Sequence, residues 1–271
     1  TGGSCPPEAM RMRTWNGRRV RELMKATLIL ANGSVFSGTS IGSTSDRICE
    51  MVFNTSMTGY QEILTDPSYA GQGIVMSYPL IGNYGVNHED NESSRPWAEA
   101  LIVRHLARRG SNFRCEGDLD TYLKQNHITG IEGVDTRALT RILRSQGTMN
   151  GMITCAEHFS VEDCLKKIRA YEVKGTVEAV TCKTPSVHPA VGEEAFRVSL
   201  IDYGAKRNIV RELQKRRVDG FAGLRIHQHK ARGVPDLVGE VAGAFHLLVG
   251  VAGVVSGADA HGQREAQRVR A

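Results

Sequence analysis

Cysteine is the residue type of this chain with the most potential for covalent chemistry. A cysteine nucleophile needs an activated, exposed thiolate with a histidine nearby. No cysteine here stands in a Gly-x-Cys-x-Gly turn: Cys5 has Pro7 where the second glycine would be, and Cys155 follows Thr154. We therefore expect small buried or incidental thiols and assign no catalytic residue. The six cysteines are Cys5, Cys49, Cys115, Cys155, Cys164 and Cys182.

The sequence also gives little support for a metal site or a nucleotide-binding loop. His227 and His229 form an HxH pair, but no cysteine or carboxylate stands at ligand spacing from them, so we expect surface histidines and no metal site. Neither GxGxxG nor GxxxxGK[ST] occurs, so the usual phosphate-binding loops are missing. We accordingly expect this chain to bind no cofactor of its own.

The densest set of special residues runs from Asn54 to Gly85. Its Gly, Pro, Asn and Ser residues predict several tight turns between short strands, and such segments on a rigid scaffold often line binding sites. A purely structural interpretation is equally open for Asp66-Pro67-Ser68-Tyr69, because Pro67 alone fixes a competent turn.

The elements around this segment predict a mixed α/β first domain. Leu28 to Gly38 has the pattern of a hairpin, with Asn32-Gly33 supplying the two positive φ angles of a type I′ turn. The further strands and helices are predicted from β-branched runs and from helical spacing with capping residues. We expect strands at 48–54, 74–78, 100–104 and 149–154, and helices at 118–126, at 135–145 and from Ser160.

A second domain is indicated further along. Residues 176–196 contain Pro185, Pro189 and Gly192 with little periodicity, which predicts a linker. Residues 197–202 then alternate as a strand, a glycine turn follows, and 205–217 have helical spacing, which is the opening unit of an α/β domain.

The last 51 residues differ in composition, since 25 of them are Gly, Ala or Val. We expect residues 220–271 to be a disordered or frame-shifted tail that offers no partner strands. Within it, the uncharged run 241–258 reaches the lower length limit of a membrane span, but four glycines and His246 weaken that interpretation. We expect no membrane segment.

Length, charge and composition bound the remaining possibilities. A chain of 271 residues corresponds to one large or two medium domains, and its composition is that of an ordinary soluble globular protein. The net charge of +5 comes from the two ends, whereas residues 25–220 carry 23 basic and 23 acidic side chains. We therefore predict no nucleic-acid partner, because tracking phosphates requires concentrated positive charge. A scattered set of cysteines without CxxC, and no apolar leader, indicates the cytoplasm.

Several segments resemble the small, glutamine-hydrolysing subunit of carbamoyl-phosphate synthetase, in the family's order and approximate spacing across residues 24 to 219. A contiguous match of sixteen residues is far more specific than a short motif. The matching segments are NTSMTGYQEILTDPSY (54–69), SYPLIGNYG (77–85), ESS (92–94), SNFR (111–114), DTRALTR (135–141) and DYGAKRNI (202–209).

The resemblance implies a β/α domain at 24–175 that packs against the large subunit, after a non-family leader at 1–23. It implies that residues 197–219 begin an incomplete, flavodoxin-like α/β glutamine amidotransferase domain. In such enzymes a cysteine attacks the glutamine amide, and ammonia passes to the large subunit. There ATP, with magnesium, and bicarbonate yield carbamoyl phosphate for arginine and pyrimidine synthesis. One ligand residue carries over: Ser68 matches the serine that the first domain contributes to the glutamine site.

The chain also departs from the family. The Gly-x-Cys-x-Gly-x-Gln elbow and the His-Pro-Glu pair are absent, and His188-Pro189-Ala190 lacks the glutamate. The match stops near Asp219, so we expect a small subunit truncated after the start of its amidotransferase domain. Two interpretations follow: a small subunit of this heterodimeric enzyme, or a non-enzymatic module that docks to the large subunit but cannot hydrolyse glutamine.

Overall fold

The chain divides into two units that combine different stretches of sequence. A computed structural model describes residues 13–15, 18–20, 24–193, 195–216, 218–219, 244–249 and 252–257. Unit 1 comprises residues 1–60, 72–88 and 98–172, and unit 2 comprises 61–71, 89–97 and 173–271. Unit 2 therefore joins two short segments from the first half of the chain to the stretch that follows Glu172.

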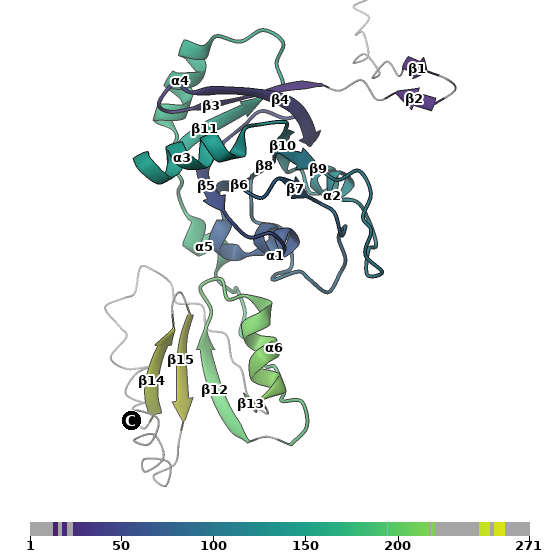
Figure 1. Ribbon diagram of the computed structural model, residues 1–271. Helices are drawn as coiled ribbons and strands as arrows, with labels where there is room; N and C mark the ends of the chain where they lie inside the picture. The colour runs from purple at the N-terminus through teal and green to yellow at the C-terminus, as the bar shows by residue number, and fades with distance from the viewer. Residues whose placement is uncertain are drawn as a thin grey trace, which may run out of the picture. The chain divides into compact units, whose positions relative to one another are not determined.

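Unit 1 is built around a closed barrel whose strand order is β10-β4-β3-β11-β5-β6-β8 (Figure 1). β5, β6, β8 and β10 pair in parallel, and the remaining neighbours are antiparallel. β10 closes the barrel because it pairs with β8 on one side and β4 on the other. The strands are β3 (Lys25–Leu30), β4 (Val35–Gly42), β5 (Arg47–Asn54), β6 (Gln72–Met76), β8 (Ala100–Ile102), β10 (Thr129–Glu132) and β11 (Met149–Thr154).

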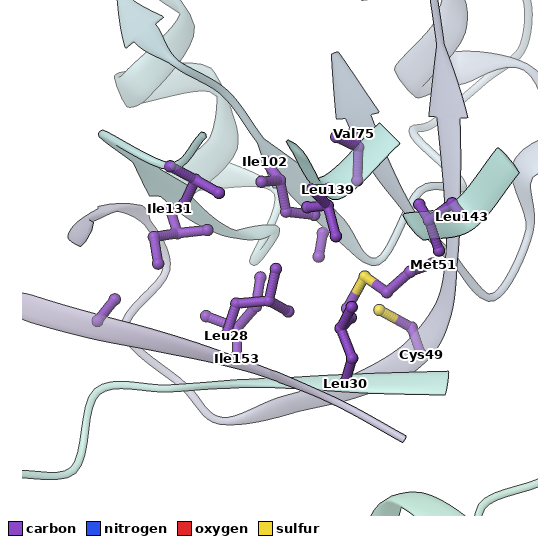
Figure 2. Close-up of a cluster of buried hydrophobic side chains, with 13 residues drawn as sticks. Leu28, Leu30, Cys49, Met51, Val75, Ile102, Ile131, Leu139, Leu143 and Ile153 are labelled. Atoms are coloured by element: carbon purple, nitrogen blue, oxygen red, sulfur yellow. The ribbon is translucent and has the colours of Figure 1, made fainter. Parts of the chain in front are cut away.

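The barrel interior is filled by apolar side chains that recur at every second position of the strands, as the pleat of a strand requires. Leu28 and Leu30 of β3 are fully buried, and so are Cys49 and Met51 of β5 (Figure 2). The interior also leaves no room for a side chain at Gly73, where a Cβ would lie 2.8 Å from the Cys49 sulfur. The other labelled members of this core are Val75, Ile102, Ile131, Leu139, Leu143 and Ile153.

Three helices of unit 1 begin where the sequence predicts, each at a side chain that accepts a backbone N–H of the first turn. These residues are Asp118 for α2 (Leu119–Gln125), Asp135 for α3 (Thr136–Gln146) and Ser160 for α4 (Val161–Ala170). α3 adds Leu139 and Leu143 to the barrel core. α4 covers Ile29 and Met152 on the outer face of the barrel.

The short strands of unit 1 are β1 (Arg13–Trp15), β2 (Arg18–Val20), β7 (Leu80–Ile81) and β9 (His105–Leu106).

The first hairpin is confirmed but its predicted turn is wrong. Gly33 has a φ of +89°, whereas His127 is the one non-glycine residue with positive φ in the described chain, so Asn32 does not supply the second positive angle of a type I′ turn. The amide of Leu30 donates instead to the carbonyl of Ser34, which gives a longer loop. The Asn32 side chain accepts the Ser34 N–H at 2.9 Å and satisfies the extra backbone donor.

Unit 2 contains the predicted second strand-helix unit. β12 (Phe196–Ile201) is followed by α6 (Arg207–Lys215) and the parallel strand β13 (Val218–Asp219). Val198 and Leu200 are buried and pack with Ala205, Val210 and Leu213. The shorter helices of unit 2 are η1 (Pro67–Tyr69) and α5 (Thr176–Val180), and α1 (Tyr60–Thr65) starts at the last residue of a unit 1 segment. α5 lies inside the predicted linker.

The expectation that the C-terminal tail offers no partner strands is wrong for two segments. β14 (Ala244–Val249) and β15 (Ala252–Gly257) pair with each other, and β15 pairs antiparallel with β12 (Figure 1). Their unbroken apolar runs suit a strand as well as a helix, which is why pattern alone did not distinguish them. The rest of the tail and most of the predicted leader lie outside the described residues.

The described helices include none with the length and apolarity needed to cross a membrane. The uncharged run 241–258, which raised that possibility, contains β14 and β15 where it is described.

Candidate functional site

Ser68 lies in a one-turn helix that Asp66 initiates. In η1 the N–H of Ser68 donates to Oδ1 of Asp66 at 2.9 Å, and the N–H of Tyr69 donates to the Asp66 carbonyl at 3.0 Å. Pro67 is buried, whereas the Ser68 side chain is exposed. Within the described residues, no hydrogen bond occupies the Ser68 hydroxyl. The backbone of this turn is thus fixed while the hydroxyl remains available to a ligand.

The carboxylate of Asp66 also forms an ion pair with Lys206, which lies far along the chain. Its side chain is 6% exposed, and its Oδ2 lies 2.7 Å from Nζ of Lys206. The hydrogen bond with Asp66 and the carboxylate's charge raise the pKa of Lys206 above its usual value, so the ammonium persists well above neutral pH. A buried carboxylate requires such pairing, because burial without a partner is costly.

The start of α6, directly after Lys206, is capped by a residue from another segment. Lys206 is the N-cap residue but makes no side-chain cap. Glu92 takes this role: its carbonyl accepts the N–H of Arg207 at 2.7 Å and its carboxylate accepts the N–H of Asn208 at 2.9 Å. A carboxylate at this position also interacts favourably with the positive end of the helix.

Segment 89–97 is in turn bonded to the end of α1. The Glu92 N–H donates to Oγ1 of Thr65 at 2.9 Å, and Oγ of Ser93 donates to the Thr65 carbonyl at 2.7 Å. The indole N–H of Trp97 donates to Oγ of Ser93 at 2.9 Å. Residues 61–71, 89–97 and 202–208 therefore form one hydrogen-bonded cluster around Asp66.

The turn between β12 and Lys206 depends on Asp202 and Gly204. Oδ1 of Asp202 accepts the N–H groups of Gly204 and Ala205 at 2.8 and 2.7 Å. Gly204 has a φ of +104°, and a Cβ there would lie 3.0 Å from Cβ of Pro67. Only glycine suits this position, because it accepts the positive φ and lets the turn approach Pro67. A solvent-open hollow of about 370 Å³ adjoins this contact, lined by Pro67, Ser93, Asp202 and Gly204 among others.

Comparison with known proteins shows which proteins this chain resembles. Residues 28–153 match the family model described as "Carbamoyl-phosphate synthase small chain, CPSase domain". The carbamoyl phosphate synthase small chain of Clostridium perfringens is 48% identical over 193 residues, which is 71% of this chain and 54% of the relative. Over these residues the chain is similar to carbamoyl-phosphate synthase small chains.

Other small chains match to a similar extent. The pyrimidine-specific small chain of Bacillus subtilis is 45% identical over 197 residues, and the small chain of Bacillus caldolyticus is 48% identical over 197 residues. Each alignment covers 72% of this chain and 53% of the relative. The chain therefore spans about half the length of the carbamoyl-phosphate synthase small chains it matches.

The cysteines lie in environments that differ in their chemistry. Cys49 is buried in the barrel core, and desolvation raises the pKa of its thiol to about 12, so it is not a thiolate at neutral pH. Cys164 is also buried, whereas Cys115, Cys155 and Cys182 are partly exposed. The described residues contain no cluster of His, Cys, Asp or Glu able to hold a metal ion. Cys5, His227 and His229 lie outside the described residues.

Sequence reasoning selected Ser68 but missed the residues that hold its turn. Lys206 and Glu92 lie in the matching segments DYGAKRNI and ESS, but the sequence predicted no role for either residue. They lie far from Ser68 in the sequence, so no local spacing could connect them. One feature indicated that a partner such as Glu92 was needed. Lys206 makes no side-chain cap at the start of α6, so the free N–H groups of that helix must be bonded by another segment.

Proposed function

We propose that this chain acts as small chain of a glutamine-dependent carbamoyl-phosphate synthetase and that Ser68 is a ligand for glutamine. The similarity to carbamoyl-phosphate synthase small chains supports the enzyme class. The observation that carries the role of Ser68 is its exposed hydroxyl on a backbone turn fixed by Asp66. A hydroxyl held in this way donates or accepts a hydrogen bond without first paying the entropy of ordering its own turn.

In this proposal, unit 1 docks to a large subunit and residues 197–219 begin a flavodoxin-like amidotransferase domain. The strand-helix-strand order of β12, α6 and β13, with the two strands parallel, supports that assignment. The completed domain would release ammonia from glutamine through a cysteine nucleophile, with a histidine moving the proton. The large subunit would use that ammonia with bicarbonate, ATP and magnesium to make carbamoyl phosphate for arginine and pyrimidine synthesis in the cytoplasm.

A second candidate is a docking module without glutaminase activity. It is favoured by one sequence observation: no cysteine among the 271 residues stands in a Gly-x-Cys-x-Gly elbow. Ammonia release from glutamine by this chain alone, abolished when a single cysteine is changed to serine, would refute the module. Binding to a large subunit without ammonia release would support it.

The test of Ser68 uses a complex in which the amidotransferase half is supplied. Residues 24–216 are joined to the remaining half of the Clostridium perfringens small chain and assembled with its large subunit. Ser68→Ala removes a hydrogen bond to a charged group of the substrate, so we expect KM for glutamine to rise about tenfold or more. Ammonia-dependent synthesis by the same complex should not change.

Ser56→Ala is the matched control. Ser56 is also exposed, and its N–H donates to the Asn54 side chain at 2.7 Å, as the N–H of Ser68 donates to Asp66. It should leave the glutamine KM unaltered. An unchanged KM in Ser68→Ala, or equal losses in the glutamine and ammonia reactions, would refute a ligand role for Ser68.

A further inference from the structure

The contacts around Asp66 assign a function to a lysine that lies 138 positions from Ser68 in the chain. The Asp66 carboxylate has two oxygens with different tasks: Oδ1 accepts the Ser68 N–H at 2.9 Å and Oδ2 accepts from Nζ of Lys206 at 2.7 Å. Because the carboxylate is planar, fixing one oxygen sets the direction of the other. We infer that Lys206 is a positioning residue, which orients the Asp66 carboxylate and thereby the turn that presents the Ser68 hydroxyl.

Lys206 is itself held in place from two sides. The Asp202 carboxylate accepts the N–H groups of Gly204 and Ala205, which precede Lys206. Glu92 accepts the N–H groups of Arg207 and Asn208, which follow Lys206, through its carbonyl and its carboxylate. The lysine therefore starts from a fixed backbone, which reduces the side-chain entropy lost on pairing with Asp66. An isolated surface lysine would not orient its partner as well.

Removing the ammonium would leave the Asp66 carboxylate buried with one of its two oxygens unpaired. Such a group turns toward water, which weakens the bond from the Ser68 N–H. Pro67 would still restrict the backbone, so we expect the turn to loosen rather than to unfold. The effect should be confined to residues 66–70.

A role of Lys206 in catalysis rests on the proposed glutamine site, but its effect on the Ser68 turn can be measured without glutamine. In the ¹⁵N-labelled 271-residue chain, Lys206→Met should speed hydrogen exchange of the Ser68 amide on the order of tenfold and shift its ¹H–¹⁵N resonance. Lys206→Arg, which keeps the cation, should restore most of the protection. The matched control is Lys215→Met at the C-terminal end of α6, because Lys215 pairs with Glu212 at 2.9 Å rather than with Asp66.

The outcomes separate this inference from the proposed function. Faster exchange at Ser68 in Lys206→Met alone supports the positioning role, even if Ser68→Ala leaves the glutamine KM unchanged and so refutes the ligand role. Unchanged exchange at Ser68 overturns the inference, and so does an equal increase throughout unit 2. If Lys206→Met does not fold, Asp66→Asn with intact Lys206 tests the same link, and unaltered Ser68 exchange there would overturn it.

Discussion

The two units of this chain are stabilised in contrasting ways. The barrel of unit 1 has a core cluster of thirteen buried residues, all but Val134 from strands and α3, and three of its helices carry their own caps. Among the described residues, the corresponding cluster of unit 2 around β12 has two buried residues, Val198 and Leu200. Around Ser68 the contacts are polar: an ion pair, a cap supplied by Glu92 and side chains that bond backbone groups.

This contrast indicates where stability and function reside. The burial of apolar side chains contributes a large free energy that depends little on the direction of each contact, so it suits a scaffold. Hydrogen bonds and ion pairs contribute less free energy but fix direction, so they suit a site. Substitutions in the barrel should therefore change stability, whereas substitutions around Asp66 should change how one hydroxyl is presented.

The largest effect is expected in the barrel core. Leu28 is fully buried, and Leu28→Ala should cost about 2–5 kcal/mol of unfolding free energy through lost burial and a cavity. Leu213→Ala in α6 is the comparison, since Leu213 is only partly buried against the cluster of unit 2. Urea unfolding followed by circular dichroism measures both. Equal losses would contradict the contrast between the units.

A smaller loss is expected where two barrel strands meet most closely. A Cβ at Gly38 would clash with the Glu132 carbonyl oxygen, so Gly38→Ala must displace backbone and should cost roughly 1–3 kcal/mol. At Gly117 the nearest atom is 3.4 Å away, an ordinary contact, and Gly117→Ala should stay within about 0.5 kcal/mol. A thermal melt of each variant makes the comparison. Similar costs at both positions would show that the barrel relaxes around the added methyl.

The smallest stability effect concerns pH. Burial raises the pKa of Cys49 from 9.0 to about 12, so the folded state favours the neutral thiol. This contribution is complete below pH 9 and is lost as pH rises from 9 toward 12, by about 1.4 kcal/mol at pH 10. Cys49→Ala should therefore flatten the fall in unfolding free energy between pH 8 and 10. An unchanged slope in Cys49→Ala would mean that its thiol is not desolvated.

The sequence predicted the local parts of this structure and missed the parts that depend on distant contacts. Asp118, Asp135 and Ser160 start helices because a cap acts within three residues, and 149–154 is a strand as its pattern predicts. The closed barrel was not predicted, since β10 joins strands that are distant in the sequence. In segment 54–85, where turns between short strands were expected, residues 60–65 form a helix instead.

The candidate site likewise combines a turn that local residues determine with contacts between residues distant in the sequence. The turn at Asp66-Pro67-Ser68-Tyr69 follows from its own residues, because proline and an aspartate cap suffice to form it. The pairing of Asp66 with Lys206 depends on tertiary contacts, as does the capping of α6 by Glu92. Neither partner is marked by local spacing.

The most direct test of the account is a double-mutant cycle on glutamine use in the complex with a supplied amidotransferase half. KM for glutamine is measured for Ser68→Ala, Lys206→Met and the double variant, with ammonia-dependent synthesis as reference. If Lys206 acts through the Ser68 turn, each single variant raises the glutamine KM and the double variant matches Ser68→Ala, because residues that act as a unit are not additive. A double variant whose KM rises by the product of the two single effects would contradict the account.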